Sequence, residues 1–500
     1  MLSLLPVYKL SKQMTECPWL NKDSHRCDPK NPAPPATRTL TTYPHHRNRP
    51  KRNILLTLSG IRFCKYYCWV DAVAFFLDNS ALQEVDFSCP LDGNPGAGAT
   101  EFMTVLVASE LSKRSVDVIL LTTATGLFPS ELKVKRVKDI HEAILYSATS
   151  QLILAIRAYI SDFETILEKI KDHRDLKVLI WAHLTPNQNS LKSIAKISQV
   201  KAVICLENNQ RVRMGDSLAH RKLLTIPYGI TGNTQLVSVS KNPNTVVFVG
   251  ALVPQKGFHL LADAWPRIEK AIPDAKLYVF GSGRLYDSRI DLGPNGIATK
   301  DYENRIFRNL NKDSHNVEFL GNGDPVLRNS ILDKCKLGIV NPSAQTETFC
   351  LSAVEFGQRG VPVVGGRKYG LLDTVKHKKT GYLVINPSNL HKHIIRLLRS
   401  NSRIETFGLQ AQQFVFEKFN LSKVIDRWYN VFEAFSDHPT VSITRETKQM
   451  RIRSAQALLT FINRRLVALT QGYWPTGISV WEAMKKSGRP LRNYRRRLMK

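Results

Sequence analysis

Two glutamates stand eight positions apart in the segment NPSAQTETFCLSAVE, residues 341–355. A short apolar strand is expected to end at residue 340, and a helix is expected over 349–358. Glu347 would then lie in the turn beside the backbone N–H groups of residues 349–351, and Glu355 about two turns along the helix. Such a turn can face a sugar and a phosphate together. The spacing alone is weak evidence, because surface carboxylates are the usual explanation of such a pair.

Two other loops could bring an anion close to the backbone. DGNPGAGATE, residues 92–101, links a strand expected at 85–88 to a helix expected over 100–113. Glycines there would let an anion approach the free N–H groups of the helix, but an ordinary glycine-rich turn explains the segment equally well. FVGALVPQKG, residues 248–257, places Lys256 after a strand, where it can pair with a diphosphate or remain a solvated surface charge.

The elements that must position these loops alternate between short apolar strands and helices. After the first loop, strands are expected at 117–122, 177–181, 202–206 and 223–226. A polar break at 238–245 follows, and the pattern restarts with strands at 246–249, 276–280, 317–320, 337–340 and 361–364. Such alternation is typical of parallel sheets covered on both faces. Two runs of it predict an α/β chain with two doubly wound, Rossmann-like domains.

The expected organisation has five parts: a basic, partly flexible extension over 1–82, a first domain over 83–240, a second domain over 241–415, a helix over 416–436 that packs back on the domains, and a basic amphipathic tail over 437–500. The apolar stretch 54–77 contains Arg62, Lys65 and Asp71, which favours a buried or interfacial helix over one that crosses a bilayer.

Charge is concentrated at the ends of the chain. Lysine and arginine exceed aspartate and glutamate by 71 − 42 = 29, and residues 441–500 hold 14 − 2 = 12 of that excess. The excess favours anionic partners. The apolar stripe expected over 452–469 suits an anionic membrane surface or a partner, although a solvated helix packed on the body is the plain alternative. Nucleic-acid binding is disfavoured, because the tail has neither a zinc finger nor an aromatic-rich recognition motif.

Cysteine use and the start of the chain bear on location. Eight cysteines in 500 residues do not form a disulfide framework, which fits a reducing cytosol. The apolar run in MLSLLPVYKL is too short for a secretory signal. The expected location is cytoplasmic, including the cytoplasmic face of a membrane.

Taken in order, the segments resemble family-4 glycosyltransferases over roughly 85–435. They are the glycine-rich loop, GALVPQKG, KLYVFGSG, VEFLGN, the segment with two glutamates (a Glu-x7-Glu signature) and TGYLV. One such match arises easily by chance, whereas six in the same order do not. The resemblance implies a GT-B fold, in which two Rossmann-like domains face a cleft. It also implies a retaining hexosyltransferase that moves a sugar from a nucleotide-sugar donor to a hydroxyl of a glycan or lipid-linked glycan, in polysaccharide biosynthesis.

The resemblance also implies roles for single residues. Glu347 would contact the donor sugar and Glu355 the ribose, while Lys256 neutralises the diphosphate and Gly98 lies beside it from the other domain. His183, in WAHLTP, matches a histidine near the reacting sugar, and a solvent-exposed loop histidine is the alternative. His183 and Glu347 are therefore the predicted catalytic residues.

Three neighbouring positions, Phe349, Cys350 and Leu351, complete the predicted donor-binding set. The chain departs from the family at two places. Ala251 stands where members often carry an arginine, so another cation would have to assist Lys256. Cys350 stands where glycine is usual.

No Asp-x-Asp occurs in the chain, so a metal-dependent transferase is disfavoured and cationic side chains are expected in place of a metal or other cofactor. The resemblance implies retention without a covalent enzyme intermediate, with the departing phosphate helping to deprotonate the acceptor. Alternatives are a sugar-nucleotide epimerase or a phosphorylase on the same fold. A glycosidase is disfavoured, because it needs two carboxylates across one bond.

Overall fold

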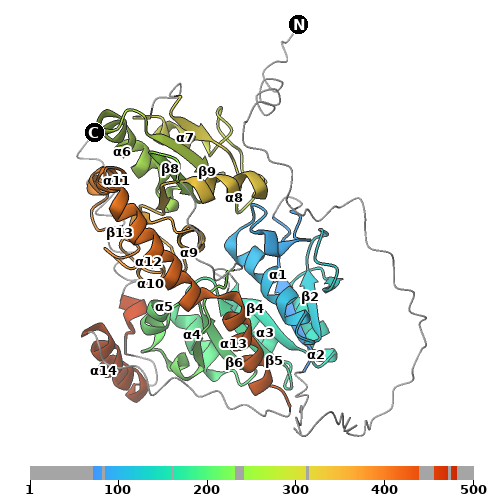
Figure 1. Ribbon diagram of the computed structural model, residues 1–500. Coiled ribbons are helices and arrows are strands. Elements are labelled where there is room, and N and C mark those ends of the chain that lie inside the picture. The colour runs from blue at the N-terminus through green and yellow to red at the C-terminus, as the bar shows by residue number, and fades with distance from the viewer. Residues whose placement is uncertain are drawn as a thin grey trace, which may run out of the picture. The chain divides into compact units, whose positions relative to one another are not determined.

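The computed structural model describes residues 71–81, 85–158, 162–230, 241–310, 315–437, 455–470 and 474–480 (Figure 1). All of these fall in one unit, Tyr67–Lys500, which contains two parallel sheets. Most of the expected N-terminal extension, up to residue 70, lies outside the described residues.

The first domain is built on a seven-stranded sheet with the order β3-β2-β1-β4-β5-β6-β7. Its strands are β1 (Val73–Leu77), β2 (Val118–Thr122), β3 (Lys133–Arg136), β4 (Ile153–Arg157), β5 (Lys177–Ala182), β6 (Val200–Cys205) and β7 (Leu223–Thr225). The central strands are apolar on both faces because both faces are covered. Phe75 packs in the core that contains α1 (Ala99–Ser112), whereas Phe76 packs in the core of α2 (Ile140–Thr149) and α3 (Phe163–Lys171).

The central strand β1 lies before residue 83, the position at which the sequence predicts that the first domain begins. From the sequence, 73–77 is expected in the extension and in a helix, but the structure has a strand there that pairs with β2 and β4. All five residues are apolar and buried, and so short a run cannot show whether its period is that of a helix or a strand. The strand expected at 85–88 is reduced to a bridge between Asp86 and Leu127.

The second domain is built on a six-stranded parallel sheet with the order β10-β9-β8-β11-β12-β13. Its strands are β8 (Thr245–Val249), β9 (Lys276–Phe280), β10 (Val317–Phe319), β11 (Leu337–Val340), β12 (Val363–Gly366) and β13 (Gly381–Val384). Its helices are α6 (Phe258–Ala271), α7 (Lys300–Ile306), α8 (Pro325–Lys334), α9 (Leu351–Gln358), α10 (Leu371–Thr374) and α11 (Leu390–Leu398). The expected strands of this domain lie within two residues of the observed ones.

The end of the second domain returns the chain to the first. α12 (Asn401–Phe419) leads directly into α13 (Leu421–Ala434), whereas the sequence predicts one helix over 416–436 (Figure 1). The break falls at Asn420, whose side-chain oxygen accepts a hydrogen bond from Lys423 N at 3.2 Å and so caps α13. The rings of Trp428 and Phe432 lie 5.9 and 5.7 Å from that of Phe75. α13 therefore belongs to the core of the first domain.

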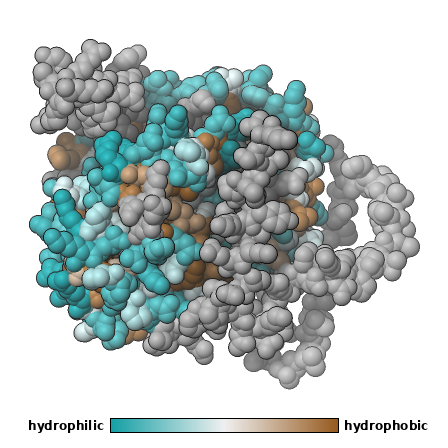
Figure 2. Space-filling model, turned by 90° about the horizontal axis from the view of Figure 1, so that it is seen from above, coloured by the Kyte–Doolittle hydropathy of each residue, from teal (hydrophilic) through white to brown (hydrophobic). Residues whose placement is uncertain are grey.

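A further segment of the tail packs on the first domain. α14 (Ala455–Leu469) contacts α5 (Asn208–Met214) and the short helix η4 (Leu218–Lys222), and residues 474–480 follow it. Among the described helices, none is both long and apolar enough to cross a membrane. On the face shown in Figure 2, hydrophilic residues dominate the edge and hydrophobic residues gather in patches nearer the middle.

In both sheets the strand order reverses direction once, between β1 and β4 and between β8 and β11. Connections on either side of such a point lead to opposite faces, which leaves a crevice outside the carboxyl ends of the two strands. Both crevices contain charged residues.

Candidate functional site

A pocket opens at the reversal point of the second sheet, and loop residues of the first domain complete its wall. The end of β8 contributes Gly250 and Ala251, and Asn341 follows β11 directly. The remaining lining comes mostly from loops and from the start of α9: Asn94, Gly96, Ala97, Ala99, Val249, Lys256, Phe280, Gly281, Leu285, Tyr286, Asn322, Arg328, Glu347, Phe349, Leu351, Ser352 and Glu355.

Lys256 and Glu347 form one ion pair in this pocket. Lys256 Nζ lies 2.8 Å from Glu347 Oε2, and Asn341 Nδ2 donates a hydrogen bond to the same oxygen at 2.6 Å. The Glu347 side chain is only 7 % exposed. Burial by itself lowers the pKa of Lys256, but the Glu347 charge outweighs burial and the pKa is raised, so Lys256 stays charged.

Glycine and a strained loop hold this ion pair in place. Gly257 follows Lys256 with φ +75°, and a Cβ on it would stand 2.6 Å from Ser343 N. Ser343 Oγ also donates a hydrogen bond to the carbonyl of Gln255. Asn341, Ala344 and Thr346 all have positive φ, between 33° and 55°. Such strain in non-glycine residues is typical of functional loops.

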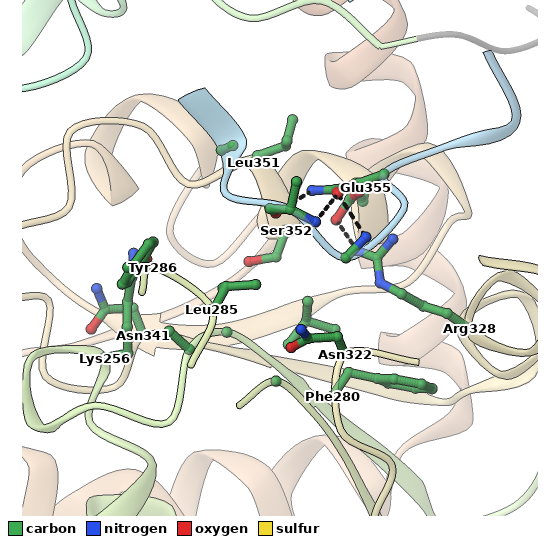
Figure 3. A pocket seen from close by; sticks show the side chains of 18 of the residues that line it. Lys256, Phe280, Leu285, Tyr286, Asn322, Arg328, Asn341, Leu351, Ser352 and Glu355 are labelled. Atoms are coloured by element: carbon green, nitrogen blue, oxygen red, sulfur yellow. Dashed lines mark hydrogen bonds and ion pairs between the residues drawn. The ribbon is translucent and has the colours of Figure 1, made fainter. Parts of the chain in front are cut away.

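Arg328 and Glu355 form a second ion pair. Arg328 Nη2 donates to Glu355 Oε2 at 2.6 Å, and the two side chains are 8 % and 13 % exposed. Arg328 lies in the first turn of α8, whose start is capped by Asp324. Figure 3 shows this pair on one side of the pocket and Lys256 with Asn341 and Tyr286 on the other. The pocket therefore offers a cation and a carboxylate at each of two ends.

The start of α9 supplies the three predicted neighbours in different ways. Phe349 and Leu351 line the pocket. Cys350, the N-cap residue of α9, is 2 % exposed and its Sγ lies 3.5 Å from Ser352 Oγ, outside the pocket lining. Its φ of −90° suits any residue with a side chain. Cysteine in place of the glycine that is usual in the family therefore does not disturb the local backbone.

Gly98 lies at the start of α1 but does not itself line the pocket, although Ala97 and Ala99 do. A Cβ on Gly98 would stand 2.2 Å from Glu101 Oε2. Gly98 thus makes room for a carboxylate of its own helix. Burial raises the pKa of Glu101, against hydrogen bonding and the charge of Arg157.

His183 lines a separate pocket, at the reversal point of the first sheet, together with Arg157 and Glu101. It is 7 % exposed, which excludes a solvent-exposed histidine. Its Nδ1 lies 2.6 Å from the Tyr228 hydroxyl, and burial, helped by the charge of Arg157, lowers its pKa to about 3. The Tyr228 ring lies 5.0 Å from that of Phe349. Neutral His183 therefore contacts Tyr228, whose ring in turn contacts Phe349 in the wall of the first pocket.

Residues 235–414 match a family model described as "Glycosyl transferases group 1". This match covers less than half of the chain, and it includes Lys256, Arg328, Glu347 and Glu355. An uncharacterized glycosyltransferase of Methanocaldococcus jannaschii is 28 % identical over 237 residues, 47 % of this chain and 60 % of that protein. A poly(ribitol-phosphate) alpha-N-acetylglucosaminyltransferase of Staphylococcus aureus is 24 % identical over 247 residues, 48 % of this chain and 45 % of that protein. The chain thus spans about half the length of such relatives.

Solved structures with both domains settle the architecture. Sucrose-phosphate synthase from Thermosynechococcus elongatus superposes with a TM-score of 0.58 over 72 % of this chain and 98 % of that chain, at 17 % identity. The Anabaena protein HepE, solved with UDP and glucose, superposes with a TM-score of 0.54 over 73 % of this chain and 100 % of that one, at 16 % identity. The fold is GT-B. The prediction of this architecture is confirmed, while family 4 as the narrower assignment stays a prediction.

The second pocket of this GT-B chain holds three charged side chains from its first domain. Arg157, at the end of β4, lies 3.4 Å from Asp78 and 3.5 Å from Glu101. Asp78 follows β1, so the carboxyl ends of the two strands at the reversal point meet here. The first GT-B domain therefore has a polar crevice of its own.

Sequence reasoning missed Arg328, Asn341 and Tyr286. The absence of arginine at position 251 was the signal that another cation was needed, and among the residues lining the pocket Arg328 is the cation besides Lys256. The residue pattern of α8 does not distinguish Arg328 from an ordinary surface arginine. Within the part of the chain that the structure describes, three or more His, Cys, Asp or Glu side chains nowhere gather as metal ligands would.

Proposed function

We propose that this chain is a retaining glycosyltransferase, which moves a sugar from a nucleotide-sugar donor to a hydroxyl of a glycan or lipid-linked glycan. One observation carries the proposal. Two cation–carboxylate pairs, Lys256 with Glu347 and Arg328 with Glu355, face each other across a pocket at the reversal point of a GT-B domain. The match to the glycosyltransferase family model over 235–414 supports it.

Such a pocket suits a ligand with hydroxyls at both ends and a diphosphate between them. Glu355 would accept hydrogen bonds from the ribose and Glu347 from the sugar, since carboxylates are strong acceptors. Lys256 would then share its charge with the diphosphate. Leu351 and Ser352, at the start of α9, line the same pocket, and no described side chain caps the first N–H groups of this helix.

The reaction would depend mainly on positioning and on stabilising the departing diphosphate. Lys256 and the start of α9 would offset the charge that develops on the leaving phosphate. That phosphate would take the proton of the attacking hydroxyl, so that the sugar keeps its anomeric configuration without a covalent link to the protein. In this proposal no metal is required.

The acceptor would approach from the first domain, where Asp78, Glu101 and Arg157 lie in the second pocket. The names of relatives fit a carbohydrate acceptor. They include the poly(ribitol-phosphate) enzyme and a lipopolysaccharide 1,2-N-acetylglucosaminetransferase of Salmonella typhimurium, 24 % identical over 206 residues. His183 would keep Tyr228 and Phe349 in place beside the donor sugar, and polysaccharide biosynthesis in the cytoplasm would be the setting.

A panel of nucleotide sugars tests the proposal. We expect one of them to raise the melting temperature, because a ligand that binds only the folded state stabilises it. The same donor should be hydrolysed slowly, and proton NMR of the first product should show the anomeric configuration of the donor. Inverted product would contradict retention. Epimerised nucleotide sugar, or release of sugar phosphate with free phosphate as acceptor, would favour the epimerase or the phosphorylase.

A further inference from the structure

The helix α14 is fixed to the first domain by polar and apolar contacts along one side. Asn463 Nδ2 donates a hydrogen bond to Asp216 Oδ2 at 2.7 Å, and the backbone N–H of Gly477 donates to the same oxygen, also at 2.7 Å. Val467 is 1 % exposed, and Ile478 packs into the core beneath β5 and β6. The side of α14 that carries Asn463 and Val467 therefore faces the protein.

A second side of α14 is apolar and exposed. Leu459, Ile462, Leu466 and Leu469, here named the α14 stripe, are 65 %, 49 %, 36 % and 80 % exposed. Their spacing of three and four residues places them along one face of the helix. Trp474 follows the helix and is 43 % exposed. Its indole N–H donates to Asn463 Oδ1 at 2.8 Å, so this ring is also held in place.

Such a fixed apolar face requires a partner. Single exposed leucines are ordinary on protein surfaces, but a continuous apolar row on an anchored helix is typical of an interaction site. The hydrogen bonds that anchor α14 also determine which side of the helix faces the protein. Asp216 and Asn463 bond to each other across the packed side, which fixes the rotation of α14 with its leucines outward.

Charge identifies the kind of partner. Residues 441–500 contain 14 basic and two acidic residues, and the last twenty positions alone contain eight basic and one acidic residue. Arg465 is exposed, and at 100° per residue it borders the α14 stripe on the side away from Val467. An apolar row and an arginine on one helix, with a tryptophan just after it and a polybasic segment further along the chain, are features of helices that lie in the interface of anionic membranes.

We propose that the α14 stripe docks on the surface of an anionic bilayer, with Leu459, Ile462, Leu466 and Leu469 at the headgroup boundary. A nucleic acid would use the positive charge but not four exposed aliphatic side chains. A protein groove would use the aliphatic side chains but not so large a basic excess. The bilayer surface uses both. This proposal does not depend on the reaction proposed above.

Vesicle flotation with the full chain tests it. We expect binding to phosphatidylcholine vesicles that contain phosphatidylglycerol at about a third of the lipid, and weak binding to pure phosphatidylcholine. The double variant Leu466→Gln/Leu469→Gln should bind the anionic vesicles about tenfold more weakly. A matched control, Leu409→Gln/Ile385→Gln, removes two aliphatic side chains that are 55 % and 74 % exposed elsewhere, and it should bind as the original chain does.

The replaced leucines and isoleucine are exposed, so both double variants should keep the original melting temperature, which separates loss of docking from loss of folding. Equal vesicle binding by the two double variants would overturn the proposal. So would equal binding to neutral and anionic vesicles. Tight binding of an oligonucleotide together with vesicle binding that ignores the stripe would point instead to a nucleic-acid surface. If the original chain formed a dimer and the stripe variant were a monomer, the partner of the stripe would be a second copy of the chain.

Discussion

Four side chains make the candidate donor site, and the sequence predicts three of them. Glu347 and Lys256 stand in turns that follow strands, and Glu355 lies on the helix α9 that comes after the Glu347 turn. Arg328 could not be predicted, because it meets Glu355 only through the packing of α8 beside α9. Cys350 illustrates the opposite case. It stands where the family usually has glycine, but a φ of −90° shows that the position accepts a side chain.

Arg328 should act on donor binding more than on the chemical step. If it orients Glu355 toward a ribose, Arg328→Ala should raise KM for the donor about tenfold and change kcat much less, since the ribose does not react. Arg328→Lys keeps the charge but not the planar donor group. Its KM for the donor should lie between that of the original chain and that of Arg328→Ala. Steady-state kinetics with the donor varied would measure this. A fall in kcat at unchanged KM would contradict the role assigned to Arg328.

At the scale of elements, the turn that carries Lys256 is held against the loop before Glu347. Gly257→Ala should break this contact, because a Cβ there meets Ser343 N at 2.6 Å and φ is +75°. We expect a loss of about 2 to 3 kcal/mol in the free energy of unfolding, together with reduced donor binding. Denaturant titration measures the first and a thermal-shift assay the second.

Gly296 supplies the matched control for this change. Its φ is +70°, but no atom lies within 4 Å of the position of a Cβ. Gly296→Ala should therefore lose only the roughly 1 kcal/mol of the left-handed backbone and keep donor binding. If both alanine variants lost the same free energy of unfolding and bound the donor equally, the contact between the turn and the Glu347 loop would contribute to neither.

The elements that sequence could predict are those with a continuous apolar pattern. β2, β5, β9 and β11 are such strands, and their observed bounds lie within a residue of the expected ones. β3 was not predicted, because its residues, KVKR, are all exposed at the sheet edge. β1 was assigned to the wrong segment, and the break between α12 and α13 was missed, because Asn420 also reads as an ordinary helical residue. The break lies at Asn420 because this residue forms a β-bridge with Ile230 of the first domain.

For the whole molecule, the two domains also meet where α5 faces α10. Asn209 Nδ2 donates to Asp373 Oδ2 at 2.6 Å, and Lys418 lies 3.7 Å from the other oxygen of Asp373. Glu207 comes just before α5, with Arg213 at 3.7 Å. Burial first, and then the neighbouring Asp373 carboxyl, raise the pKa of Glu207 to about 9 against the charge of Arg213. A proton on Glu207 therefore stabilises this contact between the domains.

Stability should consequently fall with rising pH. Folded Glu207 holds a proton that the unfolded chain releases above its ordinary carboxyl pKa, so the contribution is complete below about pH 4.5 and is lost progressively up to about pH 9. Glu207→Gln cannot titrate, and its melting temperature should decline less between pH 6 and pH 9. Parallel curves for the variant and the original chain, measured in the same buffers, would show that Glu207 does not carry this proton.

The central claim is that the pocket between the two ion pairs binds a nucleotide sugar, and a binding comparison tests it directly. Glu355→Gln keeps the shape of the side chain and a partner for Arg328, whereas Glu405→Gln removes an exposed carboxylate on α12 as a control. Calorimetric titration with the donor found in the panel should show at least tenfold weaker binding by Glu355→Gln and unchanged binding by Glu405→Gln. Equal affinity in both variants, or no nucleotide sugar that binds the original chain, would contradict the account.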